Sequence, residues 1–192
     1  MVNWDRVNAI NYESKAFIDA HWFNVAKNLL VSANLLKPKI NDVWQSVEDD
    51  SVDTTTRVLA DYYTGVYFML LGYAVENLFK GAIVQKKSLN FRKQFKEKKK
   101  FPKELRGHDL VLLAKKANFI FTRDDEELLR RLTRSAVWYG RYPVPLYYRD
   151  INASQTFSDG SSFSVSWFGS SDIERLDDLV ERIKSQFEHI TG

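Results

Sequence analysis

A carboxylate and an ammonium stand one helical turn apart in an otherwise apolar segment, at Glu76 and Lys80. Glutamate before lysine is the favourable order for a helical ion pair. The run before them is apolar on nearly every side, which predicts burial, and an unpaired buried carboxylate is costly or takes up a proton. Two interpretations stay open. Glu76 forms a local ion pair with Lys80, or it points into a cleft where Arg141 or His108 is its partner.

Two later motifs supply those partners. His108 lies in Gly107-His108-Asp109-Leu110 at a predicted helix start, where it either caps the helix or takes part in chemistry. Arg141 follows a predicted helix end, in Gly140-Arg141-Tyr142-Pro143. Its guanidinium can hold a carboxylate or a phosphate through two hydrogen bonds, and neighbouring tyrosines such as Tyr142 could stack on a base. Alternatively, Arg141 is locked to Glu76 and fixes the fold.

Several classes of site are excluded by the sequence. The chain has no cysteine, which rules out disulfides, thiolate metal sites and a cysteine nucleophile. The sequence has no glycine-rich phosphate loop, HExxH pattern or nucleophile elbow. The histidines lack the spacing of metal ligands, so we expect neither a metal nor a cofactor. These histidines are His21, His108 and His189.

Composition indicates an ordinary globular protein. With 192 residues, a single domain over 1–192 is the expectation. The first residues are too polar for a signal peptide, and no apolar run reaches the roughly 18 residues of a membrane span, so we expect a cytoplasmic, non-membrane protein. Net charge is only +3, but Arg92–Lys103 holds seven basic residues and one acid. That block predicts either a poorly ordered loop or a phosphate-contacting surface.

The hydrophobic pattern predicts an all-α, antiparallel bundle of about five helices. A first helix is expected over 13–36, ended by Pro38, and the central helix within 54–86. The motif at 107–109 opens the next helix, and Thr122 with Asp125 forms a capping box for the one that ends near Gly140 and Pro143. Turn formers and alternating residues predict a small β-hairpin or ordered loop near 146–168. A final amphipathic helix begins at Ser171.

Three segments together resemble the HEPN superfamily of helical nucleotide-binding domains. They are Ala74-Val75-Glu76-Asn77-Leu78-Phe79-Lys80-Gly81, Gly107 to Ala114, and Gly140-Arg141-Tyr142-Pro143, in the order and spacing of the family's helices. The resemblance covers roughly residues 14 to 145. It implies an antiparallel bundle that forms a homodimer. It also implies a function in a toxin–antitoxin pair, in phage defence or in RNA processing.

Active members of that superfamily are metal-independent ribonucleases that carry an arginine followed four to six residues later by a histidine. Here no histidine follows Arg141 within that distance. The prediction is therefore a non-catalytic binding module for a nucleotide, RNA or partner protein, such as a nucleotidyltransferase-like neighbour. Its predicted cleft is formed by Glu76, Lys80, His108, Arg141 and Tyr142. The alternatives are a diverged ribonuclease that uses Arg141 with a tyrosine or His108, and a purely structural or assembly protein.

Overall fold

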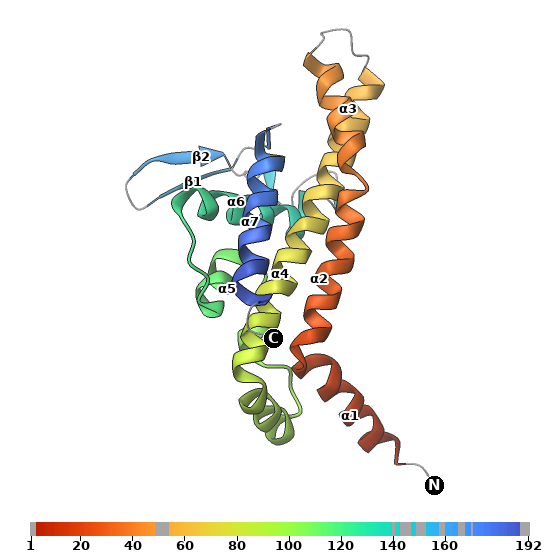
Figure 1. The fold of residues 1–192 in the computed structure, drawn as a ribbon, viewed down its shortest axis with the longest axis vertical. Helices are drawn as coiled ribbons and strands as arrows, with labels where there is room; N and C mark the ends of the chain where they lie inside the picture. The colour runs from red at the N-terminus through yellow and green to blue at the C-terminus, as the bar shows by residue number, and fades with distance from the viewer. Residues whose placement is uncertain are drawn as a thin grey trace.

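The structure, a computed structural model, describes residues 3–48, 54–139, 141–142, 147–148, 153–157, 160–164, 168–169 and 171–188. These residues confirm the predicted all-α bundle with a small hairpin (Figure 1). The described α-helices are α1 Trp4–Phe17, α2 Asp19–Asn34, α3 Lys37–Glu48, α4 Thr54–Lys98, α5 Leu110–Ala117, α6 Arg123–Arg134 and α7 Ser171–Glu188. A 3-10 turn, η1, covers Lys103–Leu105, and a π-helical turn, η2, covers Ser135–Tyr139.

The hairpin consists of β1 Ser154–Thr156 and β2 Ser162–Ser164, paired antiparallel with Ser154 opposite Ser164. It falls inside the segment for which the sequence predicted a hairpin or ordered loop. Figure 1 shows it projecting to one side of the helices, so it adds little to the core.

Helix α4 is the axis of the molecule. At 1.5 Å per residue its 45 residues extend about 67 Å. None of residues 63–85 is exposed and most are buried, so the middle of this helix is covered on all sides, as predicted. The helix nevertheless runs further than predicted, to Lys98. The expected poorly ordered loop is therefore wrong for residues 92–98, because Phe91 and Phe95, one turn apart, are buried and hold this part of the helix against α1.

The first predicted helix is two helices. Ile18 is extended, with φ −114° and ψ 117°, and separates α1 from α2. Side chains donate hydrogen bonds to the carbonyls at the break. Trp22 Nε1 donates to the Ala16 carbonyl at 3.1 Å, and Arg92 Nη2 donates to the Phe17 carbonyl at 3.4 Å. The sequence also predicted that Pro38 ends a helix, whereas Pro38 is the second residue of α3. Proline is tolerated there because backbone amides in the first turn have no partner within the helix.

The starts of α5, α6 and α7 were predicted correctly. Helix α5 begins after the predicted motif, but its cap is Asp109, which accepts from the Leu112 amide, and not His108 as one interpretation had it. Thr122 with Asp125 forms the predicted capping box of α6. Helix α7 begins at Ser171. The residues predicted to end α6, Gly140 and Pro143, lie outside the described residues.

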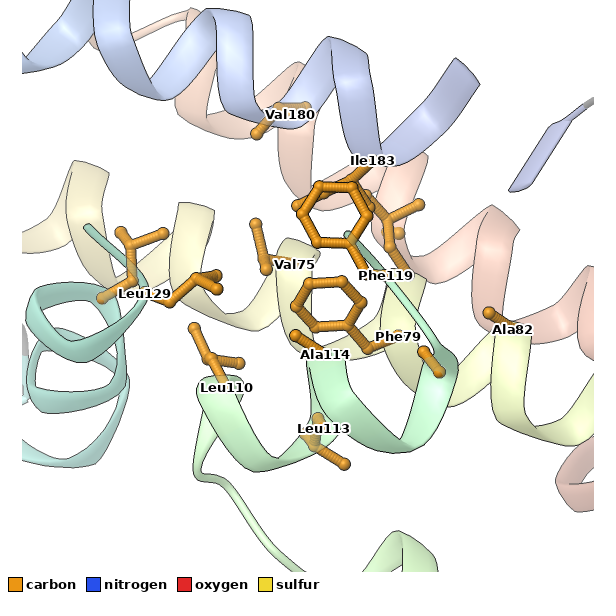
Figure 2. Close-up of a cluster of buried hydrophobic side chains, with 14 of the residues drawn as sticks. Val75, Phe79, Ala82, Leu110, Leu113, Ala114, Phe119, Leu129, Val180 and Ile183 are labelled. Atoms are coloured by element: carbon orange, nitrogen blue, oxygen red, sulfur yellow. The ribbon is translucent and has the colours of Figure 1, made fainter. Parts of the chain in front are cut away.

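Figure 2 shows the part of the core where α4, α5, α6 and α7 meet, and the same core continues to Phe17 of α1, Ala26 of α2 and Ile40 of α3. The ring of Phe79 on α4 lies 5.6 Å from that of Phe119 and 6.4 Å from that of Phe187 on α7, measured between centroids. Phe68 of α4 stacks on Phe168, just before α7. These ring contacts occur in the same order along both helices, so α7 runs parallel to α4, whereas α2 runs antiparallel to both (Figure 1).

Candidate functional site

Glu76 and Lys80 form a buried ion pair on α4. Lys80 Nζ donates to Glu76 Oε1 at 2.6 Å, and the two side chains are 9% and 6% exposed for Glu76 and Lys80 respectively. Both therefore lie in a region of low dielectric constant, where each charge depends on the other for stability. The local ion pair that the sequence offered as one interpretation is present.

His108 supplies the second contact of Glu76. Its Nδ1 lies 3.1 Å from Oε1 and 3.0 Å from Oε2 of the same carboxylate. The histidine precedes Asp109, the N-cap of α5, so this contact fastens the start of α5 to α4. The His108 side chain remains 61% exposed. The first part of the predicted cleft therefore consists of two buried charges and one solvent-exposed imidazole.

Arg141 and Tyr142 form a separate pair. Their backbone amides both donate to the Trp138 carbonyl at 2.9 Å, in a turn that follows η2. The Arg141 guanidinium lies 5.5 Å from the centroid of the Tyr142 ring, and both residues are exposed. Within the described residues, Arg141 makes no ion pair with Glu76, so the lock that the sequence suggested between them is not formed. Direct contacts unite Glu76, Lys80 and His108 but leave Arg141 and Tyr142 outside this cluster.

The segment between α4 and α5 is tied down along its length. Lys87 Nζ lies 2.7 Å from Glu104 Oε2, and Lys116 Nζ donates to the Glu104 carbonyl at 3.3 Å. Arg106 donates through two guanidinium nitrogens to the Phe101 carbonyl. Together with the His108–Glu76 contact, these bonds give the segment a defined course. The predicted poorly ordered loop is thus replaced by a helix end and a fastened connection.

Exposed lysines gather on this helix end and connection. We call the surface the basic end and define it by six residues, all exposed: Lys93, Lys96, Lys98, Lys99, Lys100 and Lys103. None of the six makes an ion pair with another described residue. From 92 to 106 the sequence has eight basic residues and two acids, which leaves the rest of the chain with a net charge of −3. The positive charge of the protein is therefore concentrated here.

An aromatic stack accompanies the basic end. The Tyr12 ring of α1 stacks on Phe95 of α4, with centroids 4.6 Å apart and planes at 17°. Tyr12 is 38% exposed, and Lys99 Nζ lies 5.4 Å from the Phe95 centroid. Sequence reasoning missed Tyr12, because nothing in the local pattern of α1 shows that it lies beside a residue more than eighty positions away.

A second feature that the sequence did not predict is a groove between α2 and α7 over the face of α4. Its volume is about 670 Å³. Apolar side chains form its floor and charged ones stand at its edges. The lining residues include Phe23, Lys27, Leu30, Val31, Lys37, Leu71, Leu78, Asp177, Val180, Glu181, Lys184 and Phe187. Amphipathic patterns show which face of each helix is apolar, but not where two neighbouring helices leave a space.

Comparison of the chain with protein-family models, curated proteins and solved structures found no match. The HEPN resemblance therefore stays a prediction carried by the three sequence segments. In the part of the chain that the structure describes, no three histidine or carboxylate side chains are grouped to hold a metal ion. No described helix combines the length and the apolar composition needed to span a membrane.

Proposed function

We propose that this chain is a non-catalytic, HEPN-like module that binds single-stranded RNA through the basic end. The observation that carries the proposal is the group of six exposed lysines without ion-pair partners among the described residues, held on a regular helix end and a fastened connection. Lysines that neutralise phosphates supply most of the affinity in sequence-independent nucleic-acid binding. Because these lysines are already positioned, binding loses less conformational entropy than it would from a disordered tail.

The Tyr12–Phe95 stack supports RNA over a simple anion. Proteins that bind single strands combine a cationic track with aromatic rings on which bases stack. Tyr12 offers a partly exposed ring beside the lysines, and Phe95 beneath it keeps that ring in place. Base stacking of this kind tolerates any sequence, so the proposal includes little sequence preference.

In this proposal the predicted site residues form two groups, one buried and one exposed to solvent. Glu76 and Lys80 are buried and position the α4–α5 connection through His108. Arg141 and Tyr142 are exposed side by side and offer a guanidinium and a ring as a separate contact for RNA. The family resemblance adds a homodimer, for which the expected mass in solution is twice that of one chain.

The test is the salt dependence of binding to a fluorescently labelled 20-nucleotide RNA, followed by anisotropy. If five phosphates are neutralised, log K falls with log[salt] with a slope of about −3.5, so doubling the salt concentration weakens binding about tenfold. Lys96→Gln with Lys100→Gln should reduce the steepness of this slope by about 1.4. The matched control is Lys39→Gln with Lys115→Gln, which removes the same charge from exposed lysines elsewhere.

Equal slopes for the two double variants would remove the basic end from the binding surface. Salt-independent or absent binding would leave the structural or assembly interpretation.

A diverged ribonuclease is tested on the same RNA in EDTA. Cleavage by the wild type that is lost in Arg141→Ala and His108→Ala would replace the binding proposal with a catalytic one. An intact RNA in the bound state agrees with a binding module.

A further inference from the structure

The groove between α2 and α7 has a closed end. Lys37, the first residue of α3, forms an ion pair with Asp177 of α7 at 2.5 Å, and this pair crosses from one wall to the other. The fully buried Tyr67 hydroxyl, one turn before Leu71 on α4, has no hydrogen-bond partner among the described residues. Burial first, and then the charge of Asp177, raise the pKa of Tyr67, so this hydroxyl stays neutral.

The opposite end carries the uncompensated charge. Lys184 pairs with Glu181 at 2.9 Å, as Lys37 does with Asp177 at the closed end. Lys27, near the Phe23 end of the lining, makes no ion pair with any residue that the structure describes. The three lysines and two acids along the edges therefore leave one unit of positive charge, on Lys27.

Between the ends the groove is long and apolar. Its lining on α2 extends from Phe23 to Asn34, which is about 16 Å along the helix axis. Leu71 and Leu78 of α4 form the floor. A volume of about 670 Å³ and an apolar lining with a few polar groups are typical of small-molecule sites rather than of packing defects.

We propose that this groove binds a long-chain carboxylate, with its alkyl chain along Leu71 and Leu78 and its carboxylate beside Lys27. A helix from a partner protein fits less well, because a helix about 10 Å across needs both ends of a groove open, whereas the Lys37–Asp177 pair closes one. An alkyl chain needs only one open end. Lys27, the one lining lysine without an ion pair among the described residues, matches a single negative charge.

The experiment is isothermal titration of the full chain with octanoate, decanoate and dodecanoate, each below its micellar concentration. Burial of each methylene group should tighten binding about fourfold, so affinity rises along the series until the chain reaches the closed end. Dodecyltrimethylammonium has the same alkyl length and the opposite charge, and it should bind at least tenfold more weakly than dodecanoate.

Two matched pairs of variants locate the site. Val31 and Val25 are both exposed valines on α2, but only Val31 lines the groove. Val31→Asp should lower dodecanoate affinity at least tenfold, and Val25→Asp should leave it unchanged. Lys27→Gln should remove most of the preference for the carboxylate over the ammonium, whereas Lys115→Gln, at an exposed lysine of α5 outside the groove lining, should not.

The proposal would be overturned if affinity did not depend on alkyl chain length, or if dodecanoate and dodecyltrimethylammonium bound equally well. Equal losses of affinity in Val31→Asp and Val25→Asp would overturn it as well. None of these results depends on RNA binding, because the lysines of the basic end do not line the groove.

Discussion

Replacing Glu76 by glutamine tests how strongly the buried ion pair holds the fold. Glutamine keeps the shape and can still accept from His108, but it removes the charge that balances Lys80. The Lys80 side chain is only 6% exposed, and its single hydrogen bond within the described structure is to Glu76 Oε1 at 2.6 Å. A buried pair broken by the loss of one partner typically costs 3–5 kcal/mol, so we expect Glu76→Gln to lower the free energy of unfolding by about 3 kcal/mol.

The measurement is urea unfolding followed by circular dichroism, with a comparison of midpoints at an unchanged m-value. Glu181→Gln is the control, because Glu181 forms the same kind of ion pair with Lys184 but is 69% exposed. Its cost should stay below about 0.5 kcal/mol. The double variant Glu76→Gln with Lys80→Met removes both charges, and it should be more stable than the sum of the two single losses predicts, by at least about 1.5 kcal/mol.

The reasoning would be refuted if Glu76→Gln cost no more than Glu181→Gln, or if the losses from the two buried substitutions simply added. Either result would mean that water or another group satisfies Lys80 without the carboxylate.

Two further predictions concern other parts of the bundle. Burial alone would raise the pKa of the Asp125 carboxyl, but hydrogen bonds from Arg182 and Thr122 outweigh it and hold the pKa below its ordinary value of 3.8. This stabilisation is present above pH 3.8 and is lost as the pH falls through the lower pKa of the folded state. We expect Asp125→Asn to cost roughly 1–3 kcal/mol at pH 7. In acid titrations of unfolding, that cost should shrink below about pH 4. Gly72→Ala would place a Cβ atom 2.8 Å from the Leu132 carbonyl oxygen, so thermal unfolding should show a loss of about 1–3 kcal/mol despite the better helix propensity of alanine.

Local signals in the sequence predicted local structure well. The Thr122 capping box depends on residues three positions apart and is present as expected. The start of α5 was also predicted, although the sequence analysis did not name Asp109 as its cap. The pairing of Glu76 with Lys80 is likewise a matter of one helical turn. These features need no knowledge of the rest of the chain.

Features set by distant contacts were missed. No proline or glycine marks the helix break at Ile18 in the sequence. The break is stabilised by Trp22 and Arg92, whose side chains donate hydrogen bonds to the carbonyls that the helix leaves without partners. The charged surface of residues 92–98 concealed the inward spacing of Phe91 and Phe95, which continues α4 as a helix.

Only some of the contacts among the candidate site residues could be predicted from the sequence. His108 was named as one of two partners for Glu76, and the structure brings these two together. Arg141 was named as the other partner. Its position depends on the turn after η2, whose backbone conformation cannot be derived from the sequence. Neither the groove nor the Tyr12–Phe95 stack could be predicted, because each arises from how separate helices sit beside one another.

The length of α4 affects how this protein can be divided. Helices α2, α5, α6 and α7 all bury side chains against the middle of this one rod, and α1 does so near its end. A chain cut within α4 would leave each fragment with an apolar stripe and without the surface that covers it. We therefore expect that paired fragments made by such a cut would not fold separately, and that tags or reporter domains are better inserted at the exposed tip of the hairpin, near Gly160.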